Sequence, residues 1–248
     1  MQERLVKRLA CTDSTNSVAW ALAREGAPAG TVVVAEAQTQ GRGRLARAWV
    51  SPPAAGLYFS MILRPTLAVK DLAKIPLAAA VAVCQAVEAH CALQPAIKWP
   101  NDLLWGGRKF GGILTETGPI RTGANLVVLG IGLNVTTPPT AFPAALQDRA
   151  TSLLLATGQA FGKEALLSAV LARLDLVMAR LAGADFAALL NEWRRRDALQ
   201  GATLSWLTPG GEVVSGVALG LDDEGGYRIR DRAGVIHEVL SGDLALRL

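Results

Sequence analysis

The loop GRGR at residues 41–44 combines a flexible backbone with fixed positive charge. Gly41 and Gly43 let backbone N–H groups approach a ligand closely, because glycine has no side chain in the way. Arg42 and Arg44 carry planar, fork-shaped donors whose geometry suits phosphate or carboxylate. A solvated basic turn has the same composition, but this loop directly follows TVVVA, a run typical of a buried strand. Its position therefore favours a loop that binds an anionic ligand.

A second candidate stretch, KWPNDLLWGGRKFGGIL, spans residues 98–114. Lys98 and Lys109 lie on two predicted strands joined by a tight turn, with Asn101 and Asp102 between them after a proline. A strand interrupted at Pro-Asn-Asp points these polar groups away from the sheet edge. A plain proline turn with two core tryptophans explains most of the stretch. It does not explain Lys109 before FGGIL, where the paired glycines clear space for a ligand.

The third candidate is GIGLNV, residues 130–135. Gly130 and Gly132 alternate with apolar residues, and small residues on one face of a strand leave a slot flat enough for a planar ring. Asn134 is then placed to bond a phosphate or a sugar hydroxyl. A bulged core strand would have the same sequence pattern. This segment therefore indicates a ligand site only in combination with the GRGR loop and residues 98–114.

Several chemistries are disfavoured by what the sequence lacks. It contains neither the phosphate-binding pattern G-x-x-x-x-G-K-[ST] nor G-x-G-x-x-G. Its two histidines, His90 and His237, form no predicted metal cluster or Ser-His-Asp set. The three cysteines form no C-x-x-C pair, and Cys84 and Cys91 read as small core residues. We therefore predict no protein-bound metal, no histidine base and a reducing, cytoplasmic compartment.

Both helices and strands must position these segments. Apolar runs predict the strands, apolar residues at helical spacing predict the helices, and Asp13 or Ser14 is expected to cap the first helix. Turns are expected at Gly106–Gly107 and at residues 118–123. The expected strands span residues 30–38, 55–65, 96–105, 108–117 and 125–135, and the expected helices span 14–25, 71–91, 163–182 and 184–196.

After Asp197 the pattern changes to short alternating segments separated by Gly and Asp turns, which is typical of a small barrel of about five strands. We therefore predict two domains, residues 1–198 and 199–248. The longest apolar runs are too short for a membrane span, and no signal peptide is indicated. A net charge of +4 does not by itself indicate nucleic-acid binding.

Five segments together resemble the biotin protein ligases, and the likeness runs from about residue 8 to the C-terminus. The resemblance implies an α+β fold: a mixed β-sheet catalytic domain flanked by helices, similar to class II synthetases, with a small SH3-like C-terminal barrel. Some members carry an N-terminal DNA-binding domain, and this chain is expected to be of the short type without it. The segments are STN at 14–16, QTQGRGR at 38–44, KWPNDL at 98–103, RKFGGIL at 108–114 and GIGLNV at 130–135.

The resemblance implies a reaction in two steps, with ATP and biotin as substrates and Mg²⁺ alongside. Biotin's carboxylate first attacks the α-phosphate of ATP and gives biotinyl-5′-AMP and pyrophosphate. A lysine amine of a biotin carboxyl carrier protein then attacks the mixed anhydride and releases AMP. The first step needs cations to neutralise accumulating charge and no general base, which agrees with the scarcity of histidine.

The resemblance also implies roles for individual residues. Lys109, Arg44 and Asp102 are the expected catalytic residues, with Asp102 orienting or deprotonating an acceptor lysine whose free pKa is about 10.4. For Asp102 the alternative is turn stabilisation, and for Ser14 and Thr15 it is helix capping. The loop at 40–48 is expected to be disordered without ligand and to close over it. The expected biotin contacts are Ser14, Thr15, Asn16, Gln38, Gly41, Arg42, Gly43, Arg44, Lys109 and Gly112; the expected adenylate contacts are Arg42, Arg44, Trp49, Asn101, Lys109 and Asn134.

Three other functions stay open at this point. Lipoate or octanoate transfer uses a related catalytic fold, although with a glycine-richer ligand loop. A nucleic-acid-binding module would use the basic loop and show strongly salt-dependent affinity. A biotin sensor without catalysis is disfavoured by Lys109 and the two loop arginines. No nucleic-acid or membrane partner is predicted, and an exposed edge strand would allow a homodimer or docking of the carrier.

Overall fold

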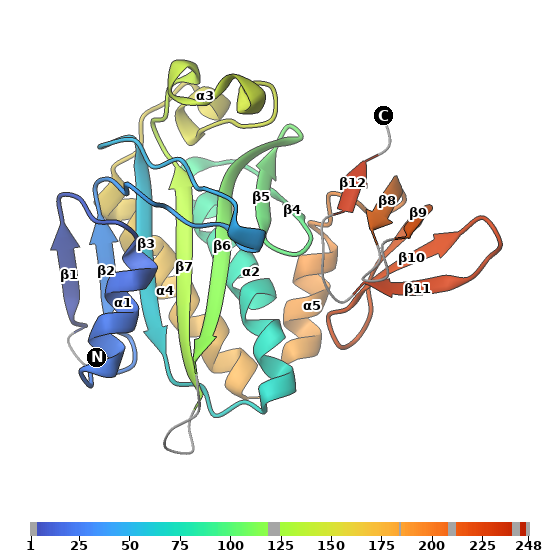
Figure 1. Cartoon of the computed structure of the whole chain (residues 1–248), viewed down its shortest axis with the longest axis horizontal. Coiled ribbons are helices and arrows are strands. Elements are labelled where there is room, and N and C mark those ends of the chain that lie inside the picture. Colours follow the sequence, from blue (N-terminus) through green and yellow to red (C-terminus); the bar gives the residue numbers. More distant parts are fainter. Residues whose placement is uncertain (1–3, 119–124, 184, 208–211, 240–243, 247–248) are drawn as a thin grey trace.

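The structure is a computed structural model that describes residues 4–118, 125–183, 185–207, 212–239 and 244–246. Within these residues the chain forms two separate β-sheets and five α-helices (Figure 1). The expected turn at 118–123 falls almost entirely outside the described residues.

The larger sheet has seven strands in the order β1-β2-β3-β7-β6-β5-β4. β1 and β2 are parallel and the other neighbouring strands are antiparallel, so the predicted mixed sheet is confirmed. The strands are β1 (Val6–Leu9), β2 (Val32–Ala35), β3 (Gly56–Leu63), β4 (Ala96–Lys98), β5 (Asp102–Trp105), β6 (Arg108–Gly118) and β7 (Leu126–Asn134).

Alternation of side chains along each strand divides this sheet into two apolar faces. On β2, Val32 and Val34 belong to the large cluster that contains helices α2 (Lys74–Cys91) and α4 (Lys163–Ala182). Val33, between them, belongs to the small cluster under helix α1 (Thr15–Arg24). In Figure 1, α2 and α4 accordingly lie behind the sheet and α1 lies in front. The front face therefore stays open beyond α1.

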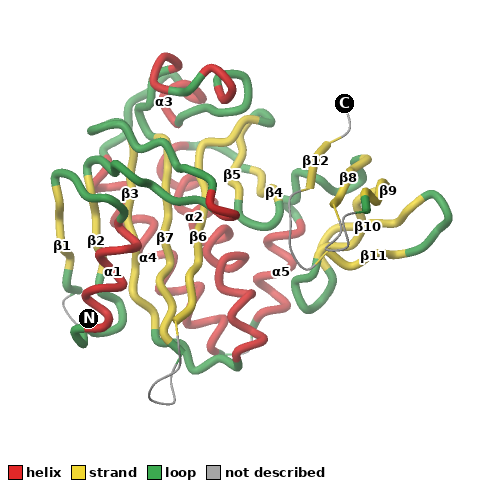
Figure 2. Tube along the Cα trace, in the orientation of Figure 1, coloured by secondary structure: helices red, strands yellow, loops and turns green. Residues whose placement is uncertain are grey.

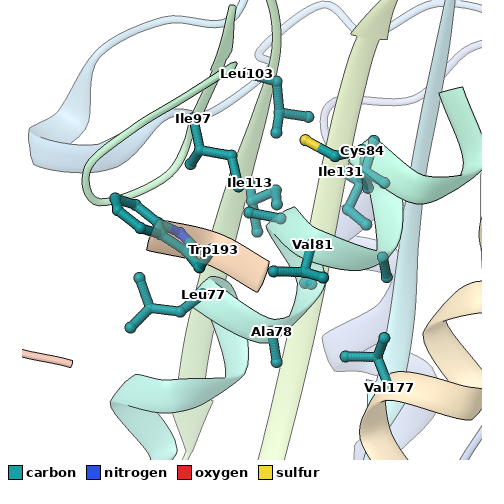
Figure 3. Close-up of a cluster of buried hydrophobic side chains, with 14 of the residues drawn as sticks. Leu77, Ala78, Val81, Cys84, Ile97, Leu103, Ile113, Ile131, Val177 and Trp193 are labelled. Carbon is teal, nitrogen blue, oxygen red and sulfur yellow. The ribbon is translucent and has the colours of Figure 1, made fainter. Parts of the chain in front are cut away.

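Helix α2 forms the centre of the core. Its residues Leu77, Val81 and Cys84 pack with strand residues such as Ile113 (Figure 3). By length and composition, Val69–Cys91 could cross a membrane, but 67% of that window is buried inside the protein, as expected for a core helix. Burial raises the pKa of the Cys84 thiol, and Cys91 is also buried, so the prediction that both are core residues is confirmed.

The smaller sheet contains five short antiparallel strands in the order β11-β10-β9-β8-β12, as predicted (Figure 1). The proposed boundary at residues 198–199 falls between helix α5 (Phe186–Arg194) and β8, and it stays a prediction. The strands are β8 (Thr203–Leu207), β9 (Val213–Leu221), β10 (Tyr227–Asp231), β11 (Ile236–Val239) and β12 (Leu244–Leu246).

The structure corrects several expected elements. Residues 96–105 form two strands, β4 and β5, because the turn at Trp99–Asn101, with a cis peptide before Pro100, separates them. Strand β1 and the short helix α3 (Leu153–Thr157) were not predicted, since both are too short to show clear periodicity. The helix expected at 184–196 is confined to α5.

A buried polar contact joins the two sheets. The Tyr227 hydroxyl of β10 donates to Asp197 Oδ2 at 2.9 Å, and the Tyr227 ring lies 5.7 Å from the Trp99 ring, centroid to centroid. The segment around Asp197 extends the larger sheet, because Ile97 N donates to Arg196 O and Ala198 N donates to Ile97 O. The smaller sheet therefore supports the turn that carries Asn101 and Asp102.

We expect Asp197→Asn to remove a loss of folding stability that occurs as the pH rises from acidic values toward neutrality. Burial raises the pKa of Asp197, so the folded state holds its proton more tightly than the unfolded chain does. Stability therefore falls as pH rises from the unfolded pKa, about 3.9, through the folded value. The Asn side chain does not titrate, so it removes this pH-dependent contribution to the free energy of unfolding. It still offers hydrogen-bonding atoms to Tyr227.

Urea unfolding between about pH 4 and pH 7 measures this effect, with Asp148→Asn at an exposed position as the matched control. The free energy of unfolding of Asp197→Asn, relative to the natural sequence, should rise with pH over this range. A constant or falling difference would contradict the assignment.

Candidate functional site

The GRGR loop has a defined backbone conformation in this structure, and the disorder expected for residues 40–48 without ligand stays a prediction. Arg42 forms an antiparallel bridge with Ala48, and Gly43 N donates to Arg47 O at 2.7 Å. A single 3-10 turn, Arg44–Ala46, forms the tip. In Figure 2 the loop crosses the open front of the sheet and ends in this turn beside β6. Backbone hydrogen bonds and the contact of Arg42 described below account for the order.

At the centre of the sheet, the predicted slot along Gly130 and Gly132 is filled by side chains: a Cβ added to Gly130 would lie 2.2 Å from Asn16 Oδ1. Gly112 of β6 and Gly132 of β7 are register partners, so two glycines lie side by side. The Trp49 indole covers them: a Cβ added to Gly132 would lie 2.6 Å from Trp49 Nε1, and one on Gly112 would lie 3.2 Å from the ring. Trp49 Nε1 is buried without a hydrogen-bond partner. In this structure the tryptophan therefore fills the slot that the sequence assigned to a ligand.

Lys109 lies at the edge of this slot. Its Nζ is 5.3 Å from the centroid of the Trp49 ring and 2.6 Å from Asp102 Oδ1. The glycine turn between β5 and β6, with positive φ at both residues, brings Lys109 back alongside Asp102. The Lys109 backbone is fixed on its other side, because Lys109 N donates to Arg149 O and Thr151 N donates to Lys109 O. Both charged groups are partly exposed, as reactive groups in an open site must be.

The STN segment at the start of α1 faces the same site from the opposite side. Ser14, Thr15 and Asn16 are all buried. Gln38 ties this segment to the loop, because its Oε1 accepts from Thr15 N at 2.8 Å and its Nε2 donates to Ser51 Oγ at 2.9 Å. Ser14 occupies the N-cap position of α1, but its side chain makes no capping hydrogen bond. Capping therefore does not account for the Ser14 hydroxyl.

The side-chain amide nitrogens of Asn101 and Asn134 both donate hydrogen bonds to backbone carbonyls of the protein. Asn101 Nδ2 donates to Ile113 O at 2.6 Å and holds the turn before β5. Asn134 is 4% exposed, and its Nδ2 donates to Thr151 O at 3.0 Å. Both side chains therefore fix backbone around Lys109 in this structure, and their contact with an adenylate stays a prediction.

Between the loop and β6 lies a cavity of about 580 Å³, within the size range of small-molecule sites. Its wall includes Glu116, which the sequence did not single out. Glu116 Oε2 accepts from Asn16 Nδ2 at 2.9 Å, Trp20 Nε1 at 3.1 Å and Arg42 Nη2 at 3.1 Å. The lining residues are Gln40, Gly41, Arg42, Gly43, Arg44, Leu45, Ala46, Arg47, Ala48, Leu114 and Glu116.

Residues 9–134, which include all of these segments, match the Biotin/lipoate A/B protein ligase family. The chain belongs to this family. A Bifunctional ligase/repressor BirA of Bacillus subtilis is 37% identical over 233 residues, 94% of this chain and 71% of the relative. A Biotin--[acetyl-CoA-carboxylase] ligase of Paracoccus denitrificans is 36% identical over 231 residues, 91% of this chain and 94% of the relative.

A solved structure of a biotin protein ligase matches this chain over nearly its whole length. The structure of a biotin protein ligase from Aquifex aeolicus in complex with biotin and ATP has a TM-score of 0.84 to this chain, with 31% identity and 98% of both chains covered. The match includes the C-terminal strands, so the expected α+β fold, a mixed sheet with a small terminal β-domain, is confirmed.

The family member described here brings nearly all of its predicted site residues to one face. Ser60 joins them from the middle of strand β3, and Glu116 joins them from near the C-terminal end of strand β6. The Ser60 hydroxyl lies 2.7 Å from Thr15 Oγ1 and 2.5 Å from Asn16 Oδ1. A polar residue in an otherwise apolar strand, as in LYFSMIL, is the signal that would have found Ser60.

Proposed function

We propose that this chain is an ATP-dependent ligase that activates biotin as biotinyl-5′-AMP and transfers it to a lysine of a biotin carboxyl carrier protein. The observation that carries the proposal is that Trp49, which directly follows the cationic loop, packs over Gly112 and Gly132 with the Lys109 ammonium 5.3 Å from its ring centroid. The biotin and ATP complex of the Aquifex aeolicus relative and the name of the Paracoccus denitrificans relative support it.

In the first step a biotin carboxylate oxygen forms a bond to the α-phosphorus, and the bond from that phosphorus to the bridging oxygen of pyrophosphate breaks. Both reactants are anions, so cations at fixed positions lower the barrier most. Lys109, held by Asp102, is placed to contact the carboxylate and then the phosphate. Arg44 lies at the tip of the loop and lines the cavity. No proton has to move, so no general base is required.

Mg²⁺ belongs to the proposal as part of the ATP substrate. The described residues contain no group of three or more His, Cys, Asp or Glu side chains that could hold a metal ion. This fits Mg²⁺, which keeps several waters and binds largely through substrate phosphates. The ion neutralises phosphate charge when ATP is bound, and the protein supplies the remaining cations.

In the second step an acceptor lysine amine attacks the carbonyl carbon of the anhydride and AMP leaves. The amine must lose a proton, and Asp102 is the carboxylate nearest to Lys109 in this site. We assign Asp102 both tasks: its Oδ1 positions Lys109, and its remaining lone pairs accept the proton of the acceptor ammonium as the new C–N bond forms and the C–O bond to the AMP phosphate breaks.

A carrier domain needs a place to dock beside this site. Beyond Gly112, strand β6 pairs with β7 but not with β5, so within the described part of the chain residues 114–118 have one backbone edge without a strand partner. An extended segment of the carrier, or of a second copy in a homodimer, would fit this edge. We propose action in the cytoplasm without nucleic acid or membrane.

Incubation with biotin, α-labelled ATP, Mg²⁺ and a carrier domain tests the proposal. Labelled biotinyl-adenylate should form without carrier, and biotinylated carrier and AMP should form with it. Parallel reactions with lipoate and octanoate test the alternative transferase. Modification of a carrier with lipoate but not with biotin would overturn the assignment, and tight biotin binding without adenylate would indicate a sensor.

A further inference from the structure

Glu116 occupies an unusual position for a carboxylate. It lies near the C-terminal end of strand β6, beside helix α1 and on the wall of the cavity, with 28% of its side chain exposed. One oxygen, Oε2, receives hydrogen bonds from two directions: Asn16 and Trp20 of helix α1, and Arg42 of the GRGR loop. Helix α1 packs on the sheet through its own apolar cluster, so Glu116 connects the GRGR loop with a helix that is held independently of the loop.

The pairing changes what Arg42 can do. While its guanidinium is bonded to Glu116 Oε2 at 3.1 Å, its charge is already matched by a carboxylate of the protein. Lys109 is likewise paired, with Asp102 at 2.6 Å, but Glu116 also joins Arg42 to helix α1 through Asn16 and Trp20. Because Arg42 and Ala48 are bridge partners at the base of the loop, fixing Arg42 fixes both strands of the loop at once.

We propose that Glu116 is a positioning residue that anchors the GRGR loop over the cavity through Arg42, and that the Arg42 side chain serves as the anchor rather than as a phosphate ligand. The proposal rests on the proposed function for its consequences in catalysis, but the anchor itself is a property of the free protein. Loss of the anchor should open the loop, weaken retention of substrate and leave the chemical step largely intact.

Limited trypsin digestion of the free protein tests the anchor without any ligand. Glu116→Gln keeps the shape of the side chain and removes its charge, and Arg42→Gln removes the partner. A half-exposed ion pair contributes modestly, so cleavage after Arg44 and Arg47 should become about two- to five-fold faster in each variant. Glu164→Gln is the matched control, because Glu164 also pairs with an arginine, Arg8, on the exposed surface away from the loop.

The double variant separates anchoring from a purely structural role of Glu116 toward α1. If both residues act through one contact, Arg42→Gln with Glu116→Gln should be cleaved no faster than the more sensitive single variant. Additive acceleration, or cleavage of the single variants at the natural rate, would overturn the proposal. Arg42 lies in an exposed loop, so its substitution remains informative even if Glu116→Gln folds poorly.

Steady-state kinetics of adenylate formation provide the second measurement. Both variants should raise KM for biotin by a similar factor, with kcat changed less than about two-fold. A large fall in kcat for Arg42→Gln alone would show that Arg42 contacts the phosphate and would refute the anchor role. If the natural sequence forms no biotinyl-adenylate, the proposed function fails, whereas the digestion experiment still decides the anchor.

Discussion

Replacing Lys109 with methionine should reduce the rate of biotinyl-adenylate formation by about 10²–10³-fold. Methionine keeps most of the length of the side chain and removes the ammonium, and loss of one preorganised group that stabilises transition-state charge typically has this effect. Biotin binding alone should weaken far less, because the charge to be neutralised accumulates only during reaction with ATP. Single-turnover formation of labelled adenylate and equilibrium binding of biotin measure the two quantities separately.

Lys7→Met is the control for this prediction, since Lys7 is an exposed lysine on the distant edge strand β1. It should retain the natural rate. Equal losses of biotin affinity and of adenylation rate in Lys109→Met would indicate a binding role only, and would contradict the assignment of Lys109 to the chemical step.

Arg44→Gly should release the activated intermediate. A hydrogen bond to a charged group contributes about 1.5–3 kcal/mol, so loss of the guanidinium should speed dissociation of biotinyl-5′-AMP by roughly 10–100-fold. Free mixed anhydride reacts with any exposed amine, so bystander proteins such as serum albumin should become biotinylated. Retention of labelled adenylate after rapid desalting, and a streptavidin blot of the bystander, measure the two effects.

Arg47→Gly is the matched variant, because it removes one positive charge and adds one glycine within the same loop. A larger leak from Arg44→Gly than from Arg47→Gly would assign the effect to position 44 rather than to loop flexibility. If Arg44→Gly retained the intermediate and the natural choice of target, Arg44 would not hold the phosphate.

The main parts of the site could be predicted because its chemistry is concentrated in short segments. The GRGR loop is recognisable from its glycine and arginine pattern, and it follows β2 as expected. Lys109 and Gly112 are three positions apart, which would place them on opposite faces of a regular strand; the register shift between β5 and β6 brings them to the same face. The terminal sheet was predictable for the same reason, since each of its strands is a short alternating segment bounded by turn residues.

Other features depend on contacts between distant segments. Glu116 is one of several carboxylates in the sequence, and only the fold brings it to Arg42, 74 positions away. Trp49 was expected beside an adenine, whereas in the structure it covers the two glycines of the slot. Its Nε1 has no hydrogen-bond partner among the described residues, and Lys109 Nζ lies 5.3 Å from its ring centroid.

A crystal structure with a non-hydrolysable biotinyl-adenylate analogue is the most direct test of the central claim, which is that Lys109 and the GRGR loop hold the reacting groups at the glycine slot. We predict the phosphate within hydrogen-bonding distance of Lys109 Nζ and the Arg44 guanidinium, the bicyclic ring beside Thr15 and Gln38, and Trp49 displaced from Gly112 and Gly132. An analogue bound elsewhere, with Trp49 still over the glycines, would contradict the account.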